Sequence, residues 1–302
     1  MLCQRIANHS GQCRMTNQRP IDDHDRPPLF FPYWAKTYGD EYHLLIYHAL
    51  DVAAVGSEYL KHHPRLRRFL ARALGVPENH VAQWIGFFIA LHDVGKFSES
   101  FQSQQPTLFQ QLQSRQGRSN YATRHDILGY WAWRQWLAPL LSREDWFGLG
   151  AHFRHYRPLM PWIGAVTGHH GQPPKENAQN QLTLLNCFPE VDQQALIAFA
   201  RAVRGLFWRD APPPVAPTLD SETLKQTSWW LAGLTVLADW LGSNRNYFAF
   251  NRNPMPLADY WQHAQTVAHR ALHESGALPP VSASVTAFST LFPKLDRPTP
   301  LQ

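Results

Sequence analysis

Hydrophobic residues recur at helical spacing through most of the chain, and the alternating pattern typical of strands is almost absent. From Glu41 to about His62 the apolar positions fit an amphipathic helix. From Val81 to about His92 the chain is apolar on nearly every side, which predicts a buried central helix. Further helices are expected over residues 121–141, 192–208, 221–241 and 257–274. The pattern therefore predicts an all-α fold.

Polar and proline-rich stretches divide the chain. Residues 102–120, 171–180 and 211–217 lack the helical pattern and are expected to form surface loops. Residues 1–25 are polar and aperiodic, which predicts a flexible N-terminal extension. A compact domain is expected over residues 26–275, and residues 276–302, rich in Pro, Ser and Thr, are expected to form a linker.

Composition narrows the class of protein. Of 302 residues, 44% are hydrophobic and 17% charged, which favours a folded chain over a disordered one. No apolar run approaches the ~18 residues of a membrane span, and the N-terminus lacks a signal-peptide pattern, so we expect a cytoplasmic protein without a membrane partner.

Cys3, Cys13 and Cys187 form no paired motif, which disfavours a disulfide framework or zinc ribbon. The formal net charge of +5 is a mild bias toward anionic partners such as nucleic acid.

The 16 histidines exceed what packing requires, and histidine is the commonest metal ligand. His62, His63 and His80 are expected to be ordinary surface residues. The strongest signal is L-H-D-V-G-K, residues 91–96, at the end of the most apolar predicted helix. A His-Asp pair there would carry a large desolvation cost unless paired or metal-bound. Gly95 would end the helix and let the backbone come close, and Lys96 offers a cation suited to a phosphate.

Two other apolar segments carry matching groups. His48 lies in L-L-I-Y-H-A-L-D-V, and Asp239 lies in L-T-V-L-A-D-W-L-G. A single buried histidine is most often a satisfied core residue, whereas an isolated buried carboxylate is harder to explain. Together with His92 and Asp93 they offer two imidazoles and two carboxylates, which suit a transition-metal ion with open positions for water and substrate.

This order of residues resembles the HD superfamily of metal-dependent phosphohydrolases. Further histidines lie between the HD pair and Asp239, namely His125 in R-H-D-I-L-G and His169 and His170 in T-G-H-H-G. With D-W-L-G-S, which ends at Ser243, the order resembles the HD nuclease domain of the type I CRISPR helicase-nuclease. The resemblance covers about residues 33–275, and F-S-T-L-F-P followed by R-P-T-P-L-Q resembles the linker and entry motif of that family's helicase part. An excised nuclease domain and a separate nuclease subunit both remain open.

The resemblance implies an all-α, HD-domain helical bundle with irregular loops that binds two divalent transition-metal ions, for which Mn, Fe, Co or Ni are suited. The first ion would be held by His48, His92, Asp93 and Asp239. The second would be held by Asp93, as a bridge, with His125, His169 and His170. Asp93, Lys96 and Ser243 are expected to be catalytic, with Lys96 facing the scissile phosphate and Ser243 assisting as a hydroxyl donor.

The implied activity is metal-dependent hydrolysis of phosphodiester bonds in single-stranded DNA, by an endonuclease that degrades invading DNA in CRISPR interference. The implied partners are single-stranded DNA, the C-terminal helicase domain of the same full-length protein and the CRISPR RNA-guided surveillance complex. Residues 276–302 would then lead toward a helicase domain outside this chain. Two alternatives stay open: an HD-type nucleotide or cyclic-nucleotide phosphohydrolase with one metal, and a non-catalytic docking module.

Several side chains offer means of gripping DNA. Cations suit the backbone and aromatic rings suit the bases. Aromatic residues at helical spacing are nevertheless usually core, and an arginine-rich run is usually a solvated face. The candidates are Arg65, Arg67, Arg68, Arg154, His155 and Arg157 for the backbone, and Trp131, Trp133 and Trp136 for base stacking.

Overall fold

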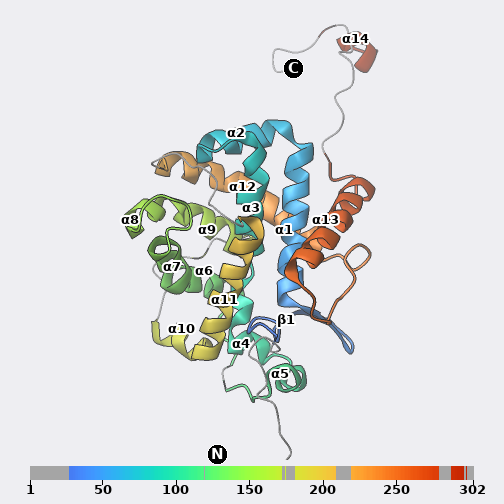
Figure 1. Cartoon of the computed structure of the whole chain (residues 1–302). Helices are drawn as coiled ribbons and strands as arrows, with labels where there is room; N and C mark the ends of the chain where they lie inside the picture. The colour runs from blue at the N-terminus through green and yellow to red at the C-terminus, as the bar shows by residue number, and fades with distance from the viewer. Residues whose placement is uncertain are drawn as a thin grey trace, which may run out of the picture.

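Helix α1 (Leu45–His62) runs through the middle of the molecule and organises its packing (Figure 1). The computed structural model describes residues 27–118, 120–171, 174, 181–208, 219–278, 287–295 and 297. Within these ranges, α1 packs most extensively against α3 (Val81–Ala90), α12 (Ser221–Gly242) and α13 (Leu257–Glu274). The all-α class expected from the sequence is confirmed.

Most of the remaining helices surround this central set, whereas α14 (Phe288–Leu291) lies apart from it (Figure 1). The surrounding helices are α2 (Pro64–Leu74), η2 (Glu78–His80), η3 (Val94–Phe97), α4 (Glu99–Gln102), α5 (Pro106–Gln113), α6 (His125–Ala132), the π-helical turn η4 (Trp133–Leu137), α7 (Ala138–Arg143), α8 (Phe153–Tyr156), η5 (Arg157–Leu159), α9 (Met160–Thr167), α10 (Gln181–Cys187) and α11 (Glu190–Phe207). Local sequence fixes several of their ends. Asp220, for example, caps α12 by accepting a hydrogen bond from the Thr223 backbone N–H at 3.0 Å.

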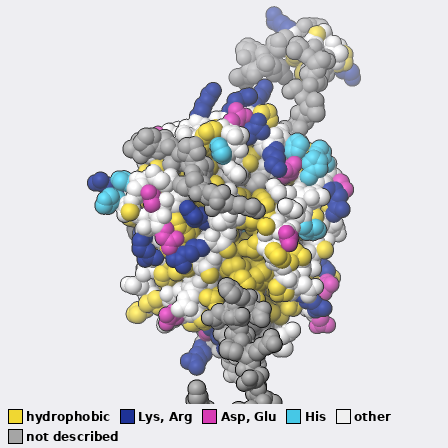
Figure 2. All heavy atoms as spheres, viewed as in Figure 1, with side chains coloured by type: hydrophobic (Ala, Val, Ile, Leu, Met, Phe, Trp, Pro, Cys, Tyr) yellow, Lys and Arg dark blue, Asp and Glu magenta, His cyan; other side chains and the backbone are white. Residues whose placement is uncertain are grey.

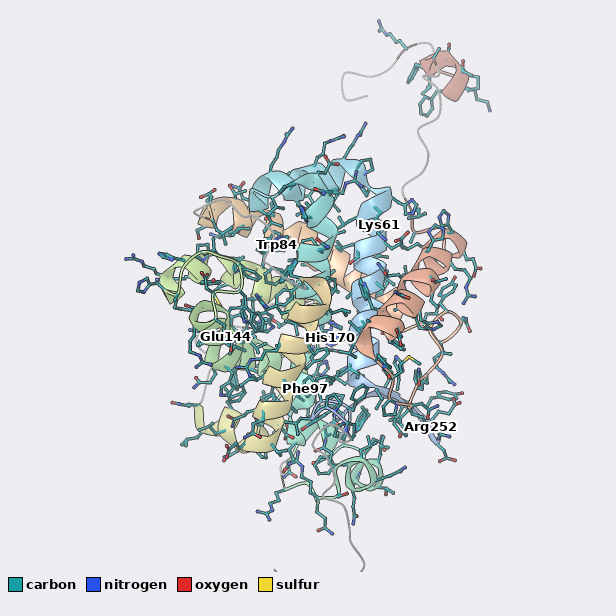
Figure 3. All side chains as sticks on the ribbon, in the orientation of Figure 1. Lys61, Trp84, Phe97, Glu144, His170 and Arg252 are labelled. Atoms are coloured by element: carbon teal, nitrogen blue, oxygen red, sulfur yellow. The ribbon has the colours of Figure 1, made fainter. Side chains whose placement is uncertain are left out.

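Helix α3 is the buried centre of the hydrophobic core. Its Trp84 and Phe88 side chains are fully buried, and Phe88 meets the ring of Trp162 edge-on at a centroid distance of 5.7 Å. Trp84 and Phe97, another fully buried ring, are labelled in Figure 3. Because large rings fill the space around α3, the backbone at its C-terminal end is held in one position. The expected buried central helix is confirmed.

A small antiparallel hairpin of β1 (Trp34–Tyr38) and β2 (Glu41–Leu44) precedes α1. The expectation of a helix from Glu41 is wrong for residues 41–44, which form β2. Gly39 adopts a left-handed φ of 56° in the tight turn between the strands. Two such short strands give too little alternation to be recognised by their period.

Other expectations for the local structure were partly wrong. Residues 102–120 contain α5, with a buried Phe109, rather than a loop throughout. Gln102 is also fully buried, because its side-chain amide bonds to the backbone of Trp34. The helix expected over 121–141 begins at His125 and includes the π-helical turn. Helices α2, α10 and α14 were not expected from the sequence, and α14 lies within the linker expected over residues 276–302.

Three expectations fall largely or wholly outside the described residues. The extension at residues 1–25 and the loop at 211–217 lie outside them completely, and so do residues 172–173 and 175–180 of the loop expected at 171–180. Among the described residues, no helix combines the length and the apolar character that crossing a bilayer requires.

Candidate metal and active site

The His-Asp pair lies in the turn that follows α3. The His92 backbone N–H donates to the Ile89 carbonyl at 3.0 Å as α3 ends, and η3 begins directly after Asp93. Since the chain leaves the helix here, neighbouring side chains are not held about 100° apart as they would be within one. His92 Nε2 accordingly lies 3.4 Å from Asp93 Oδ2. The turn presents both groups to one site.

Gly95 brings a second element against this turn. A Cβ atom there would lie 1.8 Å from the backbone carbonyl oxygen of His125 and 2.6 Å from the backbone nitrogen of Gly129. The close backbone approach expected at Gly95 therefore occurs, and its partner is α6. The expectation that Gly95 ends the apolar helix is wrong, because α3 already ends at Ala90.

The first candidate ligand set comes from three segments. His48 on α1 is fully buried, and its Nε2 atom lies 3.2 Å from Asp93 Oδ2 and 3.3 Å from Asp239 Oδ1. Asp239 lies near the C-terminal end of α12. His92 Nε2 lies 3.8 Å from the same Asp239 oxygen. The four groups expected to hold the first ion thus surround one point.

The second candidate set gathers around the other oxygen of Asp93. His125, the first residue of α6, places its Nε2 atom 3.4 Å from Asp93 Oδ1, and His169 Nε2 lies 3.6 Å from it. His170 Nε2 lies 3.0 Å from His125 Nε2. His169 is buried, whereas His170 is exposed, so this set lies nearer to solvent. His170 is labelled near the centre of Figure 3.

Asp93 therefore lies between the two sets with one oxygen facing each. Oδ2 faces His48 and His92, while Oδ1 faces His125 and His169. Of the other six candidate ligands named from the sequence, these four approach the carboxylate directly, while Asp239 and His170 lie beside them. Groups of His and Asp side chains close enough to share an ion recur here in three combinations: His48, His92 and Asp239; His92, Asp93 and His169; and His125, His169 and His170.

Buried polar atoms test whether these residues fit metal ions. Among the described residues, His48 Nε2, His92 Nε2 and Asp93 Oδ1 are buried and have no hydrogen-bond partner, although carboxylate or imidazole groups lie nearby. Leaving such atoms unpaired is costly. The second ring nitrogens of His92 and His169 contact the Ile89 and Val166 carbonyls at 2.8 and 3.0 Å, an arrangement that orients a ligating imidazole. The donor set therefore fits divalent cations.

Burial also lowers the pKa values of three histidines and so favours the neutral imidazole, which is the form that binds metals. Burial, with a contribution from Lys36, lowers the pKa of His48 to about 4. Burial lowers the pKa of His125 to about 2 and, together with His92, that of His169 to about 4. These imidazoles are neutral at neutral pH, as metal ligands must be.

The pKa values of the two carboxylates are also lowered, but by neighbouring groups and against the effect of burial. Burial by itself would raise the pKa of Asp93, but the Lys96 ammonium group and His92 hold it well below its usual range. Burial would likewise raise the pKa of Asp239, and contact with His48 and His92 lowers it far below that range. Both side chains are therefore anionic at neutral pH, as carboxylates that hold a metal ion must be.

Two lysines flank the carboxylates. Lys96 on η3 is buried and places its Nζ atom 2.7 Å from Asp93 Oδ2. Lys36 on β1 lies 3.9 Å from Asp239 Oδ1, and burial together with the nearby Lys96 lowers its pKa. Ser243 Oγ donates to Asp239 Oδ1 at 2.9 Å. Lys96 and Ser243, both named from the sequence, thus contact the Asp93 and Asp239 carboxylates.

Two residues at the site were missed. Lys36 belongs to the hairpin that the helical pattern concealed. The Tyr121 hydroxyl lies 2.8 Å from His125 Nδ1 and also accepts a hydrogen bond from the His125 backbone N–H at 2.9 Å. The four-residue spacing between Tyr121 and His125 was visible, but it gave no signal of this turn.

Some of the candidate DNA-contacting residues are buried in the core instead. Trp131 and Trp133 are buried, and the indole of Trp133 donates to the carbonyl of Leu91, the residue before His92, at 3.3 Å. Their role is in the core, so the base-stacking alternative is wrong for these two. Arg67 pairs with Glu78 at 2.9 Å, while Arg65 and Arg68 lie exposed on α2.

The sequence is similar to a known protein family and to characterised proteins. The profile of the family "Cas3, HD domain" matches residues 34–248. The CRISPR-associated endonuclease/helicase Cas3 of Escherichia coli is 32% identical over 268 residues, which cover 81% of this chain and 30% of that protein. The protein of the same name from Thermus thermophilus is 28% identical over 272 residues, covering 89% of this chain and 28% of that protein. The chain thus spans less than a third of the length of these relatives.

Solved structures agree on the fold. The T. fusca Cas3-ATP crystal structure aligns with a TM-score of 0.66 and 25% identity over 90% of this chain and 30% of that chain. The Thermus thermophilus cas3 HD domain, crystallised in the presence of Ni²⁺, aligns with a TM-score of 0.59 and 23% identity over 82% of this chain and 90% of that one. A chain of a CRISPR RNA-guided surveillance complex, pre-nicking, aligns with a TM-score of 0.62 and 24% identity, covering 82% and 29% of the two chains.

Proposed function

Because the chain belongs to the Cas3 HD domain family, we propose that it is a metal-dependent endonuclease that hydrolyses phosphodiester bonds of single-stranded DNA in CRISPR interference. One observation carries the proposal. Asp93 lies between two groups of histidines, with one carboxylate oxygen toward each. A single structural ion would need only one of these sets.

The HD domain implies the use of divalent metal ions, and we propose two. His48, His92, Asp93 and Asp239 would hold the first, and Asp93, His125, His169 and His170 the second. Imidazole-rich sets favour Mn, Fe, Co or Ni over Mg. When bound, such ions activate water and stabilise negative charge on phosphate oxygens.

The chain's own residues would position the substrate. Lys96, held by Asp93 at 2.7 Å, and Lys36, beside Asp239, place two cations at the edge of the site. Either ammonium group can pair with a non-bridging phosphate oxygen and so fix the orientation of the scissile bond. Ser243 orients Asp239 through its 2.9 Å hydrogen bond and would assist from there.

The wider role follows from the same family membership. We propose that residues 26–275 form the nuclease domain and that residues 276–302 lead toward a C-terminal helicase domain of a longer protein. The Cas3 relatives are named endonuclease/helicase, and one structural neighbour belongs to a surveillance complex. A helicase domain and an RNA-guided surveillance complex are therefore the partners we propose.

Circular single-stranded DNA tests the activity, because it has no ends and can be cut only by an endonuclease. The protein loaded with Mn²⁺, Co²⁺ or Ni²⁺ should convert the circle to linear product, and the Asp93→Asn variant should not. Rapid turnover of deoxynucleotides or cyclic nucleotides without nicking would instead favour the phosphohydrolase alternative. Unchanged behaviour of Asp93→Asn in every assay would favour the docking module.

A further inference from the structure

A second group of histidines lies on the surface, away from the candidate metal and active site. His62 at the end of α1 and His269 and His273 on α13 are all exposed, and each offers a ligand atom within 4.8 Å of the others. Their ring centroids are separated by 5.6, 5.3 and 4.5 Å. Figure 2 shows histidine side chains gathered on the right of the view, where α13 ends. These three residues are the surface histidine cluster.

Helix geometry explains why these side chains meet. His269 and His273 are four residues apart on α13 and so share one face, and Glu58 and His62 have the same spacing on α1. The two helices pack against each other along their length. Four groups able to bind a metal therefore face one another across a helix–helix contact. From the sequence, His62 was expected to be an ordinary surface residue.

Glu58 holds two of the rings in place. It is 7% exposed, and its Oε1 atom lies 3.2 Å from His62 Nε2 and 3.0 Å from His269 Nδ1. Its other oxygen, Oε2, pairs with Lys61 Nζ at 2.7 Å; Lys61 is labelled in Figure 3. A carboxylate that binds one ring nitrogen of a histidine fixes the ring and leaves its other nitrogen available to a metal. His269 Nε2 is available in this way.

We propose that the surface histidine cluster binds a further divalent transition-metal ion, of the class of Zn²⁺, Ni²⁺, Co²⁺ or Cu²⁺, which fastens α13 to α1. Three imidazoles with a water or carboxylate in the fourth position are a common ligand set for these ions. Metal–nitrogen bonds of about 2.0 Å place ligand nitrogens roughly 3.3 Å apart. Exposed side chains reach that spacing by small rotations about their own bonds.

This site is independent of the proposed function. His62 lies about 20 Å further along α1 than His48, given a rise of about 1.5 Å per residue. The surface cluster has no shared carboxylate between two sets, and Lys61 is already paired with Glu58. Its ion would therefore act on the packing of α13, the last long helix of the described chain, and not on a substrate.

Metal content measured on the full chain tests the proposal. The wild type, the His269→Gln/His273→Gln variant and a matched control, His152→Gln/His263→Gln, would be dialysed against Ni²⁺ and then analysed for nickel per chain. His152 and His263 are exposed and, among the described residues, belong to no group of potential ligands. We expect the cluster variant to hold one ion fewer than both the wild type and the control, with DNA cleavage unchanged.

The difference between variants, rather than the total, decides the outcome. If the proposed catalytic centre binds fewer ions than expected, all three totals fall together and the missing ion of the cluster variant persists. Equal nickel in all three proteins would overturn the surface site. His62→Gln, on the other helix, should reproduce the loss, which guards against misfolding of the double variant.

A thermal measurement adds a second readout. Ni²⁺ should raise the melting temperature of the wild type and the control more than that of the cluster variant, because the ion binds only the folded arrangement of the two helices. An equal shift in all three proteins would show that no ion joins α1 to α13.

Discussion

The buried candidate metal centre and the surface histidine cluster place histidine side chains in opposite surroundings. At the centre, His48 and His92 are fully buried beside two carboxylates, and their Nε2 atoms lack hydrogen-bond partners within the described chain. In the surface cluster, His62, His269 and His273 are exposed, and Glu58 already accepts from two of the rings. A buried ligand set needs bound ions to offset the cost of removing its polar groups from water. An exposed set has no such cost to offset, and an ion there would only link the two helices.

The largest expected difference between the two regions follows from Asp93→Asn. The substitution removes the negatively charged carboxylate that both ligand sets share. Loss of a residue that merely hydrogen-bonds to a metal ligand already lowers metal affinity or activity about 10- to 100-fold. Cleavage of circular single-stranded DNA should therefore fall by at least about 100-fold, while the ion of the surface cluster is retained. Nicking rates and nickel content of the same preparation measure both effects. Cleavage at the wild-type rate by Asp93→Asn would contradict the proposal that the buried centre, unlike the surface cluster, is catalytic.

Gly95→Ala should disturb the buried centre through the backbone. The added Cβ would lie 1.8 Å from the His125 carbonyl oxygen, so α6 must move away from the HD turn. Overpacking of this kind costs about 3 kcal/mol of unfolding free energy. The matched control is Gly233→Ala on α12, where a Cβ meets no atom within 4 Å and should stabilise slightly. Urea unfolding of both variants checks this, and equal stabilities would contradict the close contact.

The buried histidines should make the metal-free protein sensitive to acid. Burial lowers the pKa values of His48 and His169 to about 4, below the value near ~6.5 expected in the unfolded chain. Between these values the unfolded chain binds more protons, so stability is full above about pH 6.5 and is lost as the pH falls toward 4. The depressed pKa values of Asp93 and Asp239 extend the loss to lower pH.

Chemical unfolding of chelator-treated protein across this pH range measures the slope. His48→Gln should flatten it, because one of the groups that resists protonation is gone. A stability that does not change between pH 6.5 and 4 would contradict the account of the buried imidazoles.

The smallest expected effect concerns only the second ligand set. Tyr121→Phe removes the hydroxyl that lies 2.8 Å from His125 Nδ1. Outer partners of this kind contribute about ten-fold in metal affinity. Of the two ions proposed for the centre, the second should therefore bind about ten-fold more weakly in a nickel titration, with the first unaffected. Tyr38→Phe, an exposed tyrosine, is the control, and equal weakening of both ions would show that the sets are not separable.

The order of motifs was enough to name the groups that converge. Asp239 and the His92–Asp93 pair stood out because such groups are costly to bury in apolar segments. His48 alone was more easily explained as a core residue and became a candidate only as a member of the set. The expected roles of all four as metal ligands remain a prediction, because proximity alone does not measure binding. The helical class was equally accessible, since it rests on a period that extends over long stretches.

The missed features depend on contacts between distant segments. Lys36 reaches Asp239 because a short hairpin folds back over the site, and neither strand is long enough to show a period. Burial of Gln102 depends on the backbone of Trp34, which is far away in the sequence. His62 meets His269 only because α1 packs against α13. Such pairings follow from tertiary packing, which local patterns do not encode.

The most direct test of the central claim is a crystal structure of the chain soaked with Mn²⁺ or Ni²⁺, with the ions located by their anomalous scattering. We predict two peaks about 3.5–4 Å apart, one on each side of the Asp93 carboxylate, within bonding distance of the two ligand sets. A single peak that leaves His125, His169 and His170 without an ion, or no peak at Asp93, would contradict it.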